Sequence, residues 1–81
     1  MSIDYERMDR LYPKQKAALT RAENSGDPHK VVTAVKKAVR EWNEVGAWPD
    51  GWHRWNIAYG DAMSAILGGM YWGDISQEPW S

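Results

Sequence analysis

Residues 27–46 read DPHKVVTAVKKAVREWNEVG, and this stretch carries the clearest structural pattern in the 81-residue chain. Its apolar residues recur three or four positions apart, which places them along one face of an α-helix. They are Val31, Val35, Ala38, Trp42 and Val45. Asp27 is a favoured N-cap, Pro28 suits the first helical position, and Gly46 suits the residue after the last turn. The stretch predicts a helix whose apolar stripe must pack against other elements.

Upstream, residues 4–24 are rich in Leu, Ala, Lys and Arg, which favour helix. Ser2 is placed to cap this helix, and Asn24 is placed to end it. Pro13 interrupts the pattern, because an interior proline loses one backbone hydrogen bond and clashes with the preceding turn. We expect a short helix to about Arg10, a bend, and a second piece that begins at Pro13.

Downstream, a break at residues 46–51, GAWPDG, separates the central helix from a third one. Proline and glycine in such a cluster are typical of a turn. We expect the third helix to begin near Pro49 or Asp50 and to end at Gly68 and Gly69. Its apolar stripe comprises Trp52, Trp55, Tyr59, Ala62, Met63 and Ile66.

Tryptophan is unusually abundant, since the chain has six and no phenylalanine, and four of the six lie between residues 42 and 55. The helical spacing of Trp42, Trp52 and Trp55 predicts that they fill the seam between the second and third helices. Each such ring buries roughly 150–250 Å², which helps a small domain without cysteine to fold. Trp48 has no helical register, so two alternatives stay open: packing against Trp52, or exposure as an interface anchor.

The last residues, 70–81, contain glycine and proline breaks but also Tyr71, Trp72, Ile75 and Trp80. Disordered tails are poor in aromatic residues, and this one is not. It either folds back over the helices or binds a partner. We therefore divide the chain into a helical domain, residues 1–69, and a C-terminal tail, residues 70–81.

Together these elements predict an all-α fold with a short aromatic C-terminal tail. The fold is a small three-helix bundle, or a four-helix bundle if Pro13 divides the first helix. The chain has no cysteine, which excludes disulfides, thiolate metal sites and thiol nucleophiles. No apolar run approaches the roughly 20 residues of a membrane span, and the N-terminus is polar. We expect a cytoplasmic protein with no membrane contact.

The charges are unevenly distributed, with a net charge of +4 in residues 1–40 and −5 in residues 41–81. This asymmetry fits attraction between the two halves, within the fold or across a dimer, or else a nucleic-acid-binding end. The second and third helices have the outline of a helix–turn–helix, in which only Arg54 and Asn56 suit base edges. The phosphate contacts would be Lys14, Lys16, Arg21, Lys30, Lys36 and Lys37. DNA binding is the alternative function, but the acidic first turn of the third helix repels phosphate, so we do not expect a nucleic-acid partner.

Residues suited to catalysis or metal binding are sparse. His29 and His53 are far apart in the sequence. Asp50, His53 and Asp61 form a weak metal-like set, which lacks the paired histidines of metalloproteases. We therefore expect no catalytic residues, no cofactor and no metal site.

The segment from Gly46 to Trp55, with its core Trp-Pro-Asp-x-Trp and its continuation to Ala62, resembles small uncharacterised proteins of actinobacteria and their phages. Gly51 departs from that pattern, which has an acidic residue at this position. The resemblance is confined to this part of the second and third helices and implies no particular activity. It implies a small accessory protein, encoded by a phage or by its host, that acts by contact with host machinery.

We expect a non-enzymatic protein-interaction module that binds and modulates a host protein, with homo-oligomer formation as a further expectation. A chain of this size is too small to bury all ten of its tryptophan and tyrosine rings. Exposed aromatic residues are frequent anchors at protein interfaces. The candidate partner-binding residues are Trp48, Arg54, Tyr71, Trp72 and Trp80.

Overall fold

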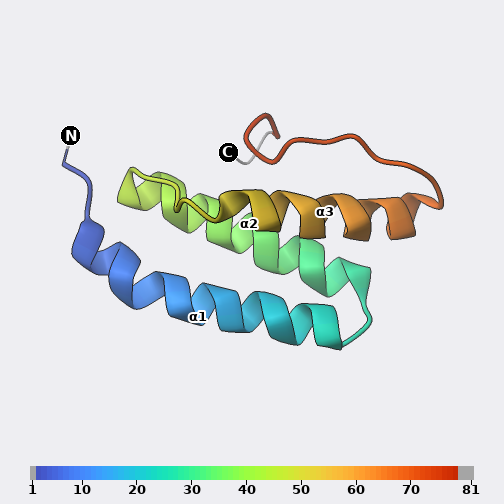
Figure 1. Cartoon of the computed structure of the whole chain (residues 1–81), viewed down its shortest axis with the longest axis horizontal. Coiled ribbons are helices and arrows are strands. Elements are labelled where there is room, and N and C mark those ends of the chain that lie inside the picture. Colours follow the sequence, from blue (N-terminus) through green and yellow to red (C-terminus); the bar gives the residue numbers. More distant parts are fainter. Residues whose placement is uncertain (1, 79–81) are drawn as a thin grey trace.

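The computed structural model describes residues 2–78, and every regular element within that range is a helix. The three helices are α1 (Tyr5–Asn24), α2 (Pro28–Val45) and α3 (Trp52–Leu67). α2 is the central element, because it packs against both α1 and α3 (Figure 1). The prediction of an all-α fold is confirmed.

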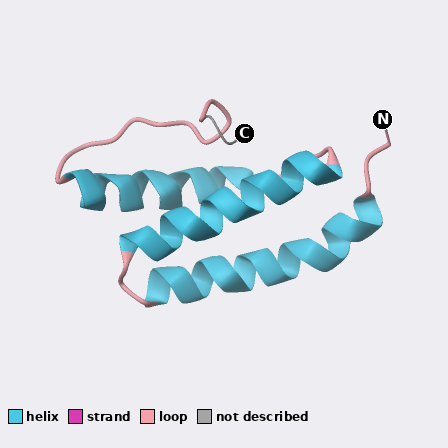
Figure 2. Cartoon of the chain, turned by 180° about the vertical axis from the view of Figure 1, so that it is seen from behind, coloured by secondary structure: helices cyan, strands magenta, loops and turns pink. Residues whose placement is uncertain are grey.

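α1 is one continuous helix, so the predicted break at Pro13 is wrong, and the described residues form a three-helix rather than a four-helix bundle. The proline still removes one backbone hydrogen bond. The helix survives because tertiary packing holds the turns on both sides of it. Tyr12 contacts the Trp55 ring, and Leu19 is buried in the core. The first turns are inclined to the rest of α1 in Figures 1 and 2, as expected for an interior proline.

The start of α1 is capped by Asp4 rather than by Ser2. The Asp4 carboxylate accepts a hydrogen bond from the Arg7 backbone N–H at 3.0 Å. The Asp4 N–H in turn donates to the carbonyl of Val45 at 3.2 Å, which ties the beginning of α1 to the end of α2. An ion pair of 2.7 Å between Arg7 and Glu44 lies at the same end of the bundle.

The predicted boundaries of α2 are confirmed. The Asp27 carboxylate accepts from the His29 N–H at 2.9 Å, which satisfies one of the free donors of the first turn. Gly46 ends the helix with φ of 91°, a left-handed conformation that only glycine adopts without strain. Its N–H donates to the Trp42 carbonyl at 2.9 Å.

α3 begins at Trp52, slightly later than expected, and follows Gly51, whose residue type provides no side-chain cap. A Cβ at Gly51 would lie 2.9 Å from the hydroxyl of Tyr12. Glycine therefore lets the turn before α3 pass close to α1. The helix ends at Gly68, which has φ of 72°.

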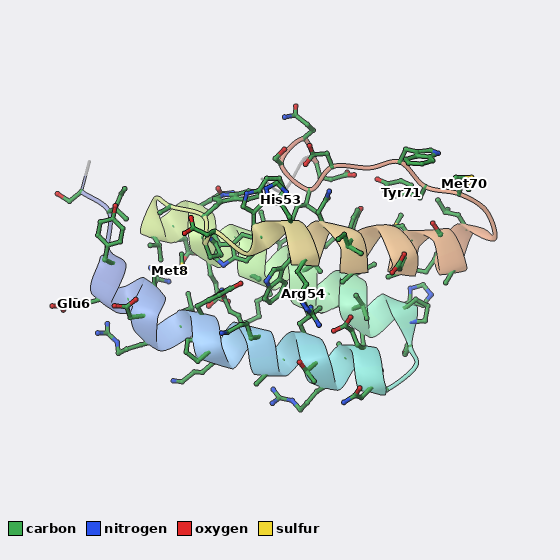
Figure 3. The ribbon with its side chains drawn as sticks, in the orientation of Figure 1. Glu6, Met8, His53, Arg54, Met70 and Tyr71 are labelled. Carbon is green, nitrogen blue, oxygen red and sulfur yellow. The ribbon has the colours of Figure 1, made fainter. Side chains whose placement is uncertain are left out.

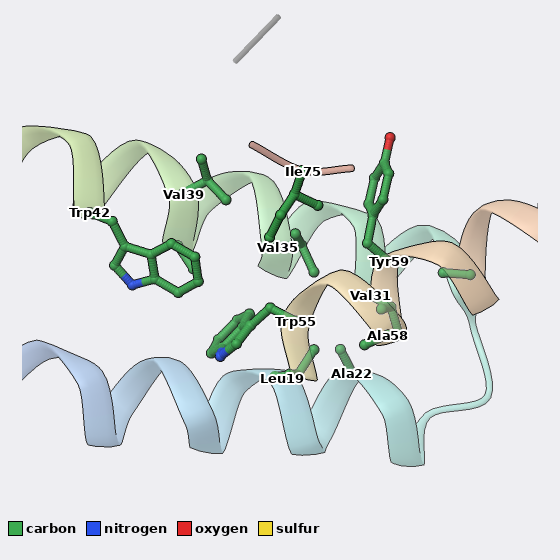
Figure 4. Close-up of a cluster of buried hydrophobic side chains, with 12 residues drawn as sticks. Leu19, Ala22, Val31, Val35, Val39, Trp42, Trp55, Ala58, Tyr59 and Ile75 are labelled. Atoms are coloured by element: carbon green, nitrogen blue, oxygen red, sulfur yellow. The ribbon is translucent and has the colours of Figure 1, made fainter. Parts of the chain in front are cut away.

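The core lies where the three helices meet, and it is built around two tryptophans (Figure 4). The rings of Trp42 and Trp55 meet edge to face, with centroids 5.3 Å apart. The apolar stripe predicted for α2 is confirmed, since each of its members is buried. The largest fully buried side chains are Leu19, Val35, Val39, Trp42, Val45, Trp55 and Ile75.

Gln15 is a polar side chain of α1 that is buried at the core, with an exposed fraction of 6%. Its Oε1 accepts a buried hydrogen bond from the indole Nε1–H of Trp42 at 2.8 Å. Its Nε2 donates to Glu41 at 3.3 Å. The amide thus pairs the one polar group of the buried indole, which would otherwise lose its bond to water without replacement.

Changing Gln15→Leu leaves the Trp42 N–H buried without its acceptor, and we expect a loss of about 1–3 kcal/mol in the free energy of unfolding. Trp42→Phe removes the donor together with part of the ring packing. In the double variant no donor remains to be satisfied, so the loss should fall short of the sum of the single losses by about 1 kcal/mol. Urea denaturation measures all three values. Strictly additive losses would show that the bond contributes nothing.

Changing Pro13→Ala restores a backbone donor inside a continuous helix and should raise the free energy of unfolding by about 1–3 kcal/mol. The neighbouring exposed substitution Lys14→Ala serves as the control and should stay within about 0.5 kcal/mol of the parent. Thermal denaturation followed by circular dichroism measures both. A loss of stability in Pro13→Ala would mean that α1 needs its bend to reach Trp55.

Candidate interaction surface

The clustered tryptophans form a row of ring contacts that runs through the bundle. From α1, Tyr12 meets Trp55 at 6.3 Å between centroids, and Trp55 meets Trp42 at 5.3 Å. Trp48 follows at 5.2 Å from Trp42, and Trp52 at 5.2 Å from Trp48. These separations lie in the range in which aromatic pairs attract beyond their burial. The row joins α1, α2, the turn and α3.

Trp48, a predicted partner anchor, lies half-buried within this row. Its indole N–H donates to the side-chain carbonyl of Asn43 at 3.0 Å. Of the two alternatives for Trp48, the structure shows the packing against Trp52. The ring therefore has a structural role at the turn, and only part of it stays accessible.

Arg54, the predicted charged contact, forms an ion pair of 2.7 Å with Glu23 of α1. Figure 3 shows its side chain directed from α3 towards α1. The Arg54 side chain keeps 59% of its surface exposed, so the pair contributes little to stability, about 0–1 kcal/mol. Its geometric effect is to bridge α1 and α3 on the side where Trp55 lies.

The tail turns back at the end of α3 and runs along that helix (Figures 1 and 2). Ile75 is fully buried in the core cluster. Its N–H donates to the side-chain carbonyl of Asn56 at 2.9 Å. Beside it, the Asp74 carboxylate accepts from the backbone and hydroxyl of Ser76, and these bonds hold the pKa of Asp74 below its ordinary value.

Tyr71, like Ile75, attaches the tail to the helices, and it lies half-buried. Its ring meets Tyr59 of α3 edge to face at 5.7 Å, and its backbone N–H donates to the Ser64 hydroxyl at 3.2 Å. Its own hydroxyl donates to the Glu78 carboxylate, and that bond raises the pKa of Tyr71 well above its ordinary value. Burial raises the pKa of Tyr59 in the same direction.

Three apolar side chains at the end of α3 and the beginning of the tail are exposed to solvent. Trp72 is 86% exposed, Met70 is 77% exposed and Leu67, in the last turn of α3, is 61% exposed. We call these three residues the tail surface. Tyr71 faces the helices, so its neighbour Trp72 faces outwards; Figure 3 marks Met70 and Tyr71 at the turn after α3. Trp80, also predicted as a partner-binding residue, lies outside the described residues.

The sequence did not predict two features of the structure, the burial of Gln15 in the core and the hydrogen bond between Ile75 and Asn56. Gln15 resembles an ordinary surface residue of a helix, and only its helical register with Leu19 and Ala22 could have indicated burial. Ile75 is apolar, but nothing near it in the sequence indicates that the Asn56 side chain accepts a hydrogen bond from its N–H. Of the predicted site residues that the structure describes, Trp48 and Trp72 are not brought together, because Trp48 lies in the turn before α3 and Trp72 follows its other end.

Within residues 2–78 no group of three acidic or histidine side chains is arranged to hold a metal ion. His53, one of the residues considered for such a set, stacks on Trp52 with centroids 4.0 Å apart. None of the helices in the described part is long and apolar enough to cross a membrane.

Gly73→Ala should release the tail from α3. A Cβ at Gly73 would overlap the Tyr71 ring, so the ring must leave Tyr59 or the tail must shift. We expect amide hydrogen exchange at Ile75 to become at least about tenfold faster, while exchange in α1 and α2 stays unchanged. Gly69→Ala is the matched control, because a Cβ there meets no atom within 4 Å. Unchanged protection at Ile75 in Gly73→Ala would show that Tyr71 does not hold the tail.

Comparison of the chain with protein-family models, with curated proteins and with solved structures finds no match.

Proposed function

We propose that this chain is a small non-enzymatic protein-interaction module of the cytoplasm, and that the tail surface is its principal contact. The observation that carries the proposal is the exposure of Trp72, at 86%, in a tail that is otherwise anchored to the helices. Tryptophan is the residue type most enriched at the energetic centres of interfaces. An indole left in water gains by transfer into a partner's pocket, because it removes a large apolar area from solvent.

Anchoring of the tail supports this proposal. Ile75 is buried and Tyr71 is bonded to Ser64 and Glu78, so the chain on both sides of Trp72 is already held. A pre-organised segment loses less conformational entropy when it binds. Met70 and Leu67, which precede the indole by two and five residues, add further exposed apolar area. Tyr71 thus acts in the proposal as a positioning residue for Trp72.

Trp48 and Arg54 belong to a different part of the molecule in this proposal. They lie at the beginning of α3, whereas the tail surface begins at its end, about 20 Å away along the helix axis. Any contact that they make with a partner is therefore separate from the contact made by Trp72. Trp80 lies near Trp72 in sequence and stays a proposed anchor.

The resemblance around residues 46–62 supports a more specific proposal, in which the chain is an accessory protein, of a phage or of its host, that modulates a host protein. A second version of the proposal is that the tail surface binds another copy of this chain and forms a homo-oligomer.

The DNA-binding alternative has less support. Arg54 is paired with Glu23, and the side-chain Oδ1 of Asn56 accepts a hydrogen bond from the Ile75 N–H, so both suggested base-reading residues are engaged within the chain.

Trp72→Ala tests the proposal, with Tyr5→Ala as the matched control because Tyr5 is an aromatic residue of α1 that is 66% exposed. We expect a partner captured from the source cell by the parent chain to bind Trp72→Ala at least about tenfold more weakly, since truncating an interface anchor costs about 2 kcal/mol or more. Tyr5→Ala should capture that partner as well as the parent does. Quantitative affinity measurements with the recovered partner give the ratio.

Sedimentation of the parent chain over a range of concentrations distinguishes self-association from binding of a different protein. If the chain self-associates, Trp72→Ala should be the variant that stays monomeric. Equal behaviour of parent and Trp72→Ala in both capture and sedimentation would contradict a role for the tail surface.

A further inference from the structure

A groove runs along the seam between α1 and α2, away from the tail surface. It consists of two adjoining cavities of about 450 Å³ and about 220 Å³. The cavities are continuous, since both are lined by Ala18, Arg21, Ala34 and Lys37. In Figures 1 and 2 α1 and the tail lie on opposite sides of the molecule, so the tail does not cover this seam.

The floor of the groove is made of alanines. Ala18 and Ala22 come from α1, and Ala34 and Ala38 come from α2. Small residues on both helices leave a depression with an apolar surface between the longer side chains. Along α1 the lining extends from Leu11 to Ser25, which corresponds to about 20 Å, or nearly four turns of a helix that would lie along it.

The rim of the groove is cationic. Lys14 and Arg21 line it from α1, and Lys30 and Lys37 line it from α2. Glu41 is the one acidic residue of the lining, and its carboxylate is engaged by Gln15. Among the described residues no ion pair involves any of these four cations. Their charge is therefore available to a ligand.

We propose that this groove binds an acidic amphipathic helix of a protein partner. The partner's apolar side chains lie over the alanine floor, and its carboxylates meet the cationic rim. A helix is favoured because the groove lies along two helices and has the length of several helical turns. An apolar floor favours a polypeptide over a nucleic-acid backbone, whose phosphates gain nothing from alanine methyl groups.

The binding mode resembles completion of a bundle. α2 is covered by α3 on one side and by α1 on another, and the groove is the part of the α1–α2 seam that no described element covers. Steering by the four rim cations favours acidic over neutral helices of the same shape. The proposal goes beyond the tail surface and does not depend on it.

Designed helical peptides serve as probes. The first carries leucines at helical spacing on one face and glutamates on both flanks; the second replaces each glutamate by glutamine. We expect the acidic peptide to bind at least about tenfold more tightly than the neutral one at low salt, with the difference reduced at high salt. Fluorescence anisotropy measures the dissociation constants. Backbone NMR shifts should map the contact to Ala18, Ala22 and Ala34.

Charge reversal locates the contact. The double variant Lys30→Glu/Lys37→Glu should bind the acidic peptide at least about tenfold more weakly. Arg40→Glu is the control for a single charge reversal on α2, since Arg40 is an exposed α2 cation outside the groove lining, and it should have a much smaller effect. Trp72→Ala should bind the peptide as the parent does, which separates this proposal from the tail surface. Circular dichroism confirms that each variant keeps its helices.

Any of four outcomes would overturn the proposal. The acidic and neutral peptides could bind equally, or the NMR shifts could map outside the groove. A DNA or RNA oligonucleotide could displace the acidic peptide from the groove and bind more tightly, which would assign the site to nucleic acid. Concentration-dependent dimerisation lost in Lys30→Glu/Lys37→Glu would assign it to a second copy of the chain.

Discussion

The buried indole of Trp42 is the group on which the packing of the three helices depends. Its ring meets Trp55 of α3 edge to face, and its N–H donates to Gln15 of α1. One side chain of the central helix therefore contacts both neighbouring helices through apolar area and through a directed bond. A small domain buries little surface in total, so a single large residue at the meeting point has a large share of the stabilisation.

The other rings extend this contact to the turn. Trp48 packs between Trp42 and Trp52 and donates to Asn43, so the segment between α2 and α3 is held although it has no regular structure. The chain thereby replaces the disulfide or metal that small folds often need with a row of aromatic contacts. The same contacts explain why α1 continues through Pro13, because Tyr12, which precedes the proline, packs against Trp55 of α3.

The tail surface and the groove arise from different physical causes. The tail surface exists because Tyr71 and Ile75 are drawn onto α3, which leaves Trp72 directed outwards. The groove exists because alanines line the α1–α2 seam while lysine and arginine surround it. Apolar area on one surface and cationic charge on the other favour ligands of different chemistry.

Local chemistry in the sequence determined the helical class, both ends of α2 with Asp27 and Gly46, and the buried stripe from Val31 to Val45. These features depend on neighbours within one turn, where capping and periodicity act. Only the tertiary structure decided the continuity of α1, the burial of Gln15 and Ile75, and the position of Trp48. Each depends on a partner distant in the sequence, such as Trp55 for Tyr12 or Asn56 for Ile75, and packing of that kind overrides local preference.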